Sequence, residues 1–445
     1  MFGEKELRRV ADQVLAASTA DETEVLILAE DDQLTRFANS IIHQNVAERD
    51  ASVRVRAVVG KRTGVASTND LSPRSLQAAA ARALETARLQ PANPDLLPMA
   101  EPAAITRVAA YSEATAACTP EARARGAAAI CRLAQEAGLS AAGAFSTGER
   151  EVVVANSHGL FAYHAGTVAD LNTVIMGNDS SGYASQTDLD VARIDAEAAG
   201  REAVGKALRS RQPRELAPGV YPVLLEAYAV EEMLDYVAHL GFGALAVQEG
   251  RSFMAGRFGQ QIVDPRISIW DDGLDPAGLP MPFDFEGVPK HRVDIIRGGV
   301  AAGVVYDRQT AAKEGREPTG HGLPAPNTRG PMPGNLFMAA GTATREEMLR
   351  ALGRGLYVTR FHYVNPVHPL KAVLTGMTRD GTFLIENGEI AAPVKNLRFT
   401  QGVLEALSQV VAVGAHTVLG RGWFGGTRAP DLALGEFRFS GATQF

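Results

Sequence analysis

The spacing of hydrophobic positions predicts that helices and strands alternate in the N-terminal half. Leu7, Val10 and Val14 recur at helical spacing, so residues 2–18 are predicted to form an amphipathic helix with charged side chains on its outer face. In residues 52–60, Val alternates with Arg or Ala, which is typical of a half-buried antiparallel strand. Further elements are expected as strands at 23–30 and 34–40 and as an Ala/Leu-rich helix at 72–90.

The same order of elements recurs further along the chain. Ala38-Asn39-Ser40 matches Ala155-Asn156-Ser157, and Gly64-Val65-Ala66-Ser67 resembles Gly182-Tyr183-Ala184-Ser185, at offsets of 117 and 118 residues. An internal duplication and a chance match of small residues both explain these echoes. A duplication predicts two similar α-β-β-α units, residues 1–90 and 119–208, that share one sheet. The second set of elements is expected as helices at 120–137 and 188–208 and strands at 150–155 and 160–176.

A polar segment with two prolines, RSRQPRELAPG at 209–219, predicts a boundary between an N-terminal α+β domain (1–212) and a C-terminal domain (220–445). The C-terminal half is rich in Gly and Pro and is predicted to be mainly antiparallel β, closed or sandwiched. Asp380-Gly381 and Asn387-Gly388 are predicted hairpin turns. Its strands are expected at 221–227, 260–265, 267–273, 293–307, 356–361, 371–390 and 432–440, and its helices at 229–240, 343–353 and 401–412.

Composition narrows the class of protein. The 44 basic and 51 acidic residues give a net charge of -7, and no run of five or more Lys or Arg occurs, so nucleic-acid binding is not expected. No 18-residue apolar stretch predicts a membrane span, and the charged first residues do not resemble a secretory leader. Only two cysteines occur, Cys118 and Cys131, and neither a disulfide framework nor a four-cysteine zinc site is possible. These features predict a cytoplasmic protein.

One predicted helix, AVEEMLDYVAHLGF at 229–242, carries candidate chemistry. Asp235 and His239 are four residues apart and share a helix face, with Glu231 and Glu232 one turn earlier. A carboxylate and an imidazole in this arrangement could hold a metal from one side, and a distant histidine such as His416 would have to complete the site. The alternative is an Asp–His hydrogen bond near a helix C-terminus, where a cationic histidine is favoured.

Other candidate residues are expected to have ordinary structural roles. His321, His362 and His368 are expected in loops or at a strand end, where packing roles are common. Asp271-Asp272-Gly273 is expected to form a turn, with contact to a cation or substrate as the alternative. No Walker loop, GxSxG elbow or HExxH motif occurs in the sequence.

An ordered series of short motifs in the C-terminal half resembles the TldD/PmbA (TldD/TldE) metalloprotease family. The motifs are Glu249-Gly250-Arg251-Ser252, Gly256-Arg257-Phe258-Gly259, Asp271-Asp272-Gly273, Tyr306-Asp307-Arg308, Thr319-Gly320-His321-Gly322, Pro333-Gly334-Asn335, Leu384-Ile385-Glu386-Asn387-Gly388 and Pro393-Val394-Lys395. The resemblance implies a two-domain α+β subunit, which pairs as a TldD–TldE heterodimer around a proteolytic chamber for unfolded peptides. In the catalytic TldD-type subunit it implies zinc bound by an HExxxH helix and a C-terminal cysteine, with the glutamate as general base.

This sequence departs from the catalytic pattern at each zinc ligand. The region equivalent to HExxxH, at about 234–240, reads Leu-Asp-Tyr-Val-Ala-His-Leu, and no cysteine follows Val413-Gly414. The chain therefore resembles the non-catalytic TldE/PmbA-type subunit, with no zinc of its own, a TldD-like partner that holds the zinc, and peptides as substrates. Two alternatives stay open: an active metallopeptidase with a non-standard site drawn from Asp235, His239 and His416, and a homodimeric peptide-binding protein without a proteolytic role.

Overall fold

A curved antiparallel sheet of six strands forms the N-terminal half in the computed structural model, which describes residues 1–423 and 425–443. Its strand order is β3-β2-β1-β4-β5-β6, so the first strands of the two sequence segments, β1 and β4, pair at the centre. The strands are β1 (Glu22–Ala38), β2 (Ile41–Val59), β3 (Arg62–Thr68), β4 (Ser140–Asn156), β5 (Phe161–Met176) and β6 (Ser181–Asp188).

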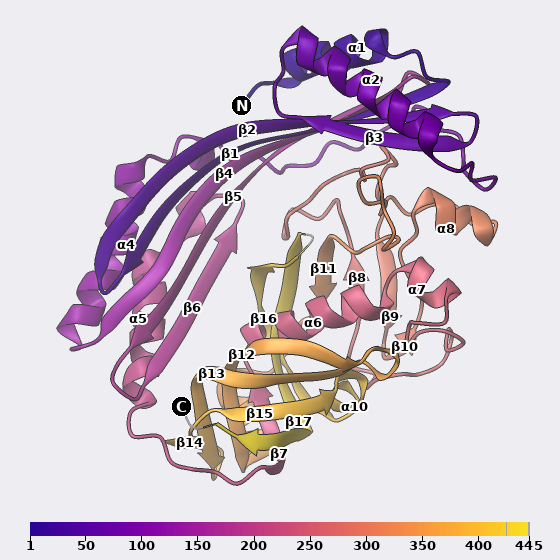
Figure 1. The fold of residues 1–445 in the computed structure, drawn as a ribbon. Helices are drawn as coiled ribbons and strands as arrows, with labels where there is room; N and C mark the ends of the chain where they lie inside the picture. The colour runs from indigo at the N-terminus through magenta and orange to yellow at the C-terminus, as the bar shows by residue number, and fades with distance from the viewer. Residues whose placement is uncertain (424, 444–445) are drawn as a thin grey trace.

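Four longer helices cover the convex face of this sheet, and the C-terminal half lies against the concave side (Figure 1). The helices are amphipathic and Ala-rich. In α2, for example, Ala79 and Ala83 are fully buried and belong to the same hydrophobic cluster as Val53 and Val55 of β2. Their bounds are α1 (Glu4–Ala17), α2 (Pro73–Leu89), α4 (Pro120–Glu136) and α5 (Ala196–Arg209), with the single turn α3 (Glu113–Ala116) before α4.

Two glycines explain the similarity between residues 64–67 and 182–185. A Cβ atom at Gly64 would lie 2.2 Å from the carbonyl oxygen of Ala83 in α2, and one at Gly182 would lie 2.1 Å from that of Ala203 in α5. A strand can approach a covering helix this closely only where it has no side chain. The observed order is helix, three strands and helix in both segments. The internal duplication stays a prediction, as does the domain division at 212–220.

Several predicted boundaries in this half are wrong. The strands expected at 23–30 and 34–40 are one strand, β1, because the chain continues straight through the acidic Asp31-Asp32 segment while paired on both sides. The helix expected from 188 begins only at Ala196. Asp195 caps it by accepting a hydrogen bond from the N–H of Ala198, and this cap fixes the start of the helix.

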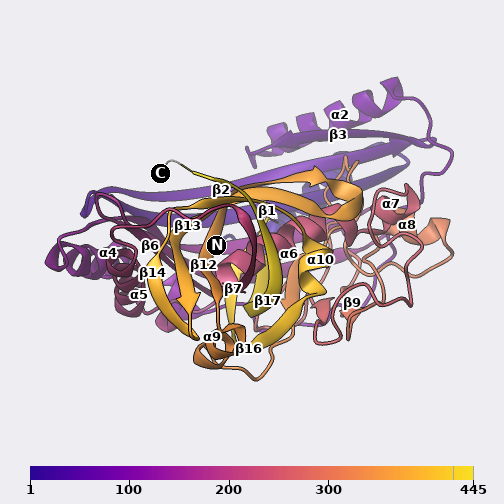
Figure 2. The ribbon, with the colours of Figure 1, turned by 90° about the horizontal axis from the view of Figure 1, so that it is seen from below.

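The C-terminal half is built on a mixed, mainly antiparallel sheet of eleven described strands. β17 pairs with both β15 and β7, which closes the strands β17-β15-β13-β12-β7 into a ring. Seen from below, β7, β12 and β17 lie side by side (Figure 2). The strands are β7 (Gly219–Leu225), β8 (Ile269–Asp271), β9 (Val293–Arg297), β10 (Val300–Ala301), β11 (Asn335–Met338), β12 (Gly355–His368), β13 (Val373–Glu386), β14 (Glu389–Pro393), β15 (Leu397–Gly402), β16 (Val410–Arg421) and β17 (Gly426–Ala442).

The helices of this half are few, as expected from the sequence. α6 packs against β12 and β17 and buries Met233, Leu234 and Val237 in the largest hydrophobic cluster. The helices are α6 (Ala227–Gly241), α7 (Ala244–Gln248), α8 (Arg308–Lys313), α9 (Arg345–Leu352) and α10 (Val403–Leu407). The α+β fold class predicted from the sequence is therefore confirmed. No helix among the described residues is long and apolar enough to cross a membrane.

Two turn predictions had opposite outcomes. Asn387-Gly388 is the expected turn between β13 and β14, with φ angles of 53° and 77°. Asp380-Gly381 is not a turn, and β13 continues through it. The positive φ angles there accompany an irregularity in the pairing with β12, and buried Asp380 forms an ion pair with Arg360 of β12.

Two further elements differ from their predictions. The helix expected at 401–412 ends at Leu407, and β16 begins at Val410, so the last residues of that segment are extended. The strand expected at 260–265 is reduced to a single bridge between Gln261 and Val300.

Candidate functional site

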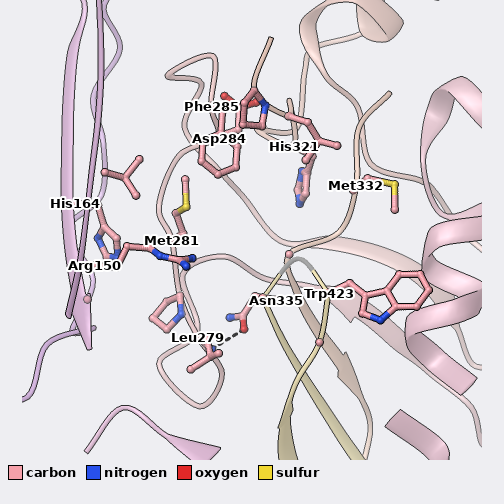
Figure 3. Close-up of a pocket in the computed structure, with 18 of the residues that line it drawn as sticks. Arg150, His164, Leu279, Met281, Asp284, Phe285, His321, Met332, Asn335 and Trp423 are labelled. Carbon is pink, nitrogen blue, oxygen red and sulfur yellow. Dashed lines mark hydrogen bonds between the residues drawn. The ribbon is translucent and has the colours of Figure 1, made fainter. Parts of the chain in front are cut away.

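A cavity lies between the concave face of the six-stranded sheet and loops of the C-terminal half. Its volume is about 590 Å³, within the usual range of ligand pockets. Arg150 of β4 and His164 of β5 reach into it from the sheet, while Met332 and Trp423 lie on the opposite side (Figure 3). The loops that form this second wall are residues 279–290, 321–335 and 421–423.

A buried carboxylate–imidazole pair fixes the loop wall of the cavity. The two side chains are completely buried, and His321 Nε2 lies 2.7 Å from Asp271 Oδ1. The other carboxylate oxygen of Asp271 accepts hydrogen bonds from the backbone N–H groups of Gly334 (2.7 Å) and Asn335 (2.8 Å). His321 Nδ1 lies 2.8 Å from the hydroxyl of Thr319. Every polar atom of the pair is thus partnered, and the pair ties loop 319–335 to β8.

The direction of the pKa shifts agrees with this structural role. Burial alone would raise the pKa of Asp271, but His321 and the hydrogen bonds hold it below its usual value. Burial also lowers the pKa of His321, in spite of the neighbouring carboxylate. His321 is therefore an ordinary packing histidine, as the sequence suggested, although its partner Asp271 was expected in a turn.

A second buried acid lines the cavity directly. Asp284 accepts hydrogen bonds from the backbone N–H groups of Gly322 (2.7 Å), Glu286 (2.9 Å) and Val288 (2.9 Å). Burial raises its pKa to about 6. Burial and the neighbouring Asp284 raise the pKa of Glu286 to about 8. No sequence pattern marks this pair, because the hydrogen-bond partners of Asp284 are backbone groups.

The helix α6 presents the candidate residues Asp235 and His239 beside the edge of the cavity. Asp235 Oδ1 accepts a hydrogen bond from the hydroxyl of Thr427, at 2.6 Å. His239 packs edge-on against Trp423, with ring centroids 5.5 Å apart. Its Nδ1 atom is buried and has no partner among the described residues. The alternative prediction, a hydrogen bond between Asp235 and His239, is therefore wrong.

The acids of α6 lie in an environment that disfavours their charged form. Burial raises the pKa of Asp235 and, with help from Asp235, raises that of Glu231 well above its usual value. Burial also raises the pKa of Glu232 to about 7. The pKa of His239 is lowered, first by burial and then by Arg329 and Arg251, so the cationic histidine expected near the helix end is not favoured.

The residues around α6 do not fit a zinc ion. A protein zinc site takes at least three protein ligands. The residue that faces Asp235 is Gly422, where a Cβ atom would lie 2.8 Å from both carboxylate oxygens, so the carboxylate already fills the space that a side chain from 422 would need. His416 is exposed on β16. Across residues 1–423 and 425–443, no group of three or more His, Cys, Asp or Glu side chains is placed to hold a metal ion.

A buried ionic network holds the start of α6 and joins the two halves. Lys206 of α5 lies 2.7 Å from Glu226, which also pairs with Arg345 (3.1 Å) and accepts from the hydroxyl of Tyr357. Arg345 pairs in turn with Asp431, at 2.8 Å, and Asp431 accepts from the N–H of Ala227, the first residue of α6. No pattern in the sequence predicted this network, because each partner is distant along the chain.

The sequence thus located part of the site. It placed Asp235 and His239 on one helix face, and it singled out motifs at 319–322 and 333–335 that line the cavity. His362 and His368 lie toward the end of β12 and line none of the described pockets around α6. The sheet residues Arg150 and His164 were missed, since nothing local marks which strand face meets the other half.

A curved antiparallel sheet lies over a closed, mainly antiparallel ring, and this α+β arrangement is shared with metallopeptidase-like proteins. Three family models match in order: PmbA/TldA metallopeptidase domain 1 over residues 23–87, the central domain over 109–211 and the C-terminal domain over 218–441. The chain belongs to the PmbA/TldD family of metallopeptidases.

Individual relatives agree with this placement. The chain is 27% identical to metalloprotease PmbA of Escherichia coli over 385 residues, which cover 82% of this chain and 81% of that protein. It is 28% identical over 241 residues to a metalloprotease of Methanothermobacter thermautotrophicus, where the match spans about half of each protein (52% and 51%). The crystal structure of TldE from Thermococcus kodakarensis has the same fold, with a TM-score of 0.88, 21% identity and coverage of 98% of this chain and 100% of that one.

Proposed function

We propose that this chain is a TldE/PmbA-like, non-catalytic subunit of a PmbA/TldD-type metalloprotease complex that acts on unfolded peptides. The observation that carries the proposal is the helix α6, where Asp235 is held by Thr427 and faces Gly422 instead of a third ligand. In this proposal the zinc belongs to a TldD-like partner, and the chain works in the cytoplasm. Its two cysteines, both buried and free, are compatible with that compartment.

The side chains on α6 favour a non-catalytic role for this chain. Hydrolysis by a zinc enzyme needs a metal-bound water and a general base beside it. The residue after Asp235 is Tyr236, whose hydroxyl donates to the carbonyl of Val364, so it is already engaged in packing. His239 lies against Trp423 with one ring nitrogen buried. Tyr236 therefore supplies no carboxylate that could act as the general base, which supports the proposal.

The large cavity supports a role in holding peptide. It is open between the sheet and the loops, and it is lined by both apolar and charged side chains. Extended peptides bind through main-chain hydrogen bonds and side-chain pockets, which tolerate many sequences. A subunit that holds substrate would need such a cavity but no metal.

The test is a cleavage assay in which an unfolded peptide is incubated with this chain, with an HExxxH-bearing homologue, and with both. We expect cleavage only in the mixture, and co-purification of the two chains. Activity of this chain alone, lost in the His239→Ala variant, would instead favour an active metallopeptidase that uses Asp235, His239 and His416. Peptide binding by a homodimer that never joins such a homologue would favour the binding protein without proteolytic role.

A further inference from the structure

We propose that the cavity under the sheet selects peptide segments in which a large apolar side chain lies next to a carboxylate. The inference deepens the proposed function, and it rests on that function only in taking the ligand to be a peptide. It follows from the contrast between the apolar and the charged groups that line the cavity.

The loop wall of the cavity carries several large apolar side chains that reach solvent. Trp423 is 56% exposed, although an indole ring of this size is normally buried or at an interface. Met281, Phe285 and Leu279 are only partly buried and line the same space, together with buried Met332. Methionine side chains adapt their shape and suit surfaces that accept varied apolar partners. An apolar peptide side chain placed here would bury this surface from water.

The charged groups of the cavity are predominantly basic. Five cations line it against three acids: Arg54, Arg150, Lys290, Arg329 and Arg421 against Asp32, Glu149 and Asp284. Arg150 is paired with Glu30 of β1. Lys290, Arg329 and Arg421 have no ion-pair partner within 4.0 Å among the described residues.

The acids of the cavity compensate these cations only in part. Asp284 is occupied by three backbone N–H groups, and its pKa is raised by burial. Glu149 accepts a hydrogen bond from the hydroxyl of Tyr111. Asp32 interacts with the charge of Arg421, but burial raises the pKa of Asp32 and so disfavours its charged form. A ligand carboxylate would supply the missing negative charge, and guanidinium groups bind carboxylates with strong, directional hydrogen bonds.

The two kinds of group lie close together in the chain and line the same cavity. Arg421 is two residues from Trp423, and Arg329 is three residues from Met332, all lining the same cavity. An apolar side chain against Trp423 and Met332 would therefore hold a neighbouring carboxylate close to Arg421 or Arg329. That carboxylate could belong to an Asp or Glu side chain or to the C-terminus of the peptide.

The experiment measures binding of fluorescein-labelled Gly/Ser peptides to the full chain by fluorescence anisotropy. One peptide carries an internal Phe-Glu pair and an amidated end, and a second carries Phe at a free C-terminus. Two controls, both amidated, carry Phe-Gln or Ser-Glu at the same place. We expect one or both of the first two peptides to bind at least tenfold more tightly than either control, and the better of them identifies the source of the carboxylate.

Matched variants locate the binding site. Trp423→Ala and Arg421→Gln are each expected to weaken binding of the preferred peptide about tenfold. The controls are Tyr363→Ala, at a 73% exposed residue away from the cavity, and Arg209→Gln, on the outer helix α5, and both should bind as the unaltered chain does. Thermal unfolding of each variant shows whether it is folded. A second readout is the fluorescence of Trp423 in a Trp270→Phe background, which should change on binding.

Equal binding of all four peptides, or unchanged binding by folded Trp423→Ala and Arg421→Gln, would overturn the inference. The result is independent of the proposed subunit role, because binding is measured without a partner. If the mixed chains cleave peptide but the cavity variants bind normally, only this inference fails. If selective binding is found but no partner restores cleavage, the inference stands and the subunit role fails.

Discussion

Two buried polar regions flank the cavity, and they differ in how their charges are compensated. In the Asp271–His321 region both side chains are fully partnered, and the pKa of Asp271 is held below its usual value despite burial. On α6, Glu231 Oε1 and His239 Nδ1 have no partner among the described residues, and the pKa values of the acids are raised. In the first region, contacts within the fold satisfy every polar atom of the pair. The second keeps polar groups that the described contacts do not satisfy, at the helix where catalytic relatives are expected to hold their metal.

The largest expected effect comes from breaking the satisfied region. Asp271→Ala leaves two backbone N–H groups and His321 buried without their acceptor, and removing one partner of a buried polar pair costs about 3–5 kcal/mol. Urea unfolding should show this loss. Asp12→Ala, at an exposed residue of α1, is the matched control and should change the free energy of unfolding little. A loss no larger than that of the control would mean that the pair does not hold the loop wall.

The next effect is a dependence of stability on pH that arises from α6. The pKa of Glu232 is raised to about 7 by burial, so the folded chain holds a proton that the unfolded chain releases at a lower pH. Stability should therefore fall as the pH rises from the ordinary pKa of a glutamate through 7.

Glu232→Gln should make this fall smaller, because only the other buried acids with raised pKa values then contribute to it. The free energy of unfolding at pH 8 should rise by about 1–3 kcal/mol. Urea unfolding at pH 5 and pH 8 measures it, with Glu85→Gln, an exposed residue of α2, as the control. If the free energy of unfolding depends on pH in the same way in Glu232→Gln and in the unaltered chain, burial of the Glu232 carboxylate does not cause the fall.

A smaller effect is expected at Thr427, whose hydroxyl is a partner of Asp235. Thr427→Val removes the hydroxyl that donates to this carboxylate and keeps the shape of the side chain. The loss of one hydrogen bond to a buried acid should cost about 1–2 kcal/mol. Unfolding of Thr106→Val, an exposed site with no such bond, provides the comparison. No difference between the two variants would show that Thr427 is not what holds Asp235.

The smallest effect is expected for His239→Ala. The ring loses its edge-on contact with Trp423 but leaves no hydrogen-bond partner unsatisfied at Nδ1, so the cost should be about 1 kcal/mol. A loss several times larger in urea unfolding would indicate that His239 has a role in the fold that its contacts do not reveal.

Local patterns predicted the elements whose causes are local. The helix faces and the Asn387-Gly388 turn depend on residues close in sequence, and they were found. Asp380-Gly381 was misread because its positive φ angles serve an irregular strand, and the partner that explains it, Arg360, lies on β12. An Asp-Gly sequence indicates positive φ angles, but whether they form a turn or an irregular strand depends on pairing with a distant strand.

The candidate site was predictable to the same extent. Helical spacing placed Asp235 and His239 on one face of α6. The groups that decide what they can do, Thr427 and Gly422, lie almost 200 residues further along the chain and come into contact only through packing of the C-terminal sheet. The cavity was not predictable, because residues from both halves of the chain line it and nothing in the sequence indicates how the halves pack together.

The metal content of the purified full chain tests most directly the claim that it has the protease architecture without a zinc site of its own. The chain, Asp235→Asn and His239→Ala would be dialysed against zinc, freed of loosely bound metal and analysed by elemental mass spectrometry. We expect much less than one zinc per chain, at the same level in all three proteins. One zinc per chain that is lost in His239→Ala would contradict the claim.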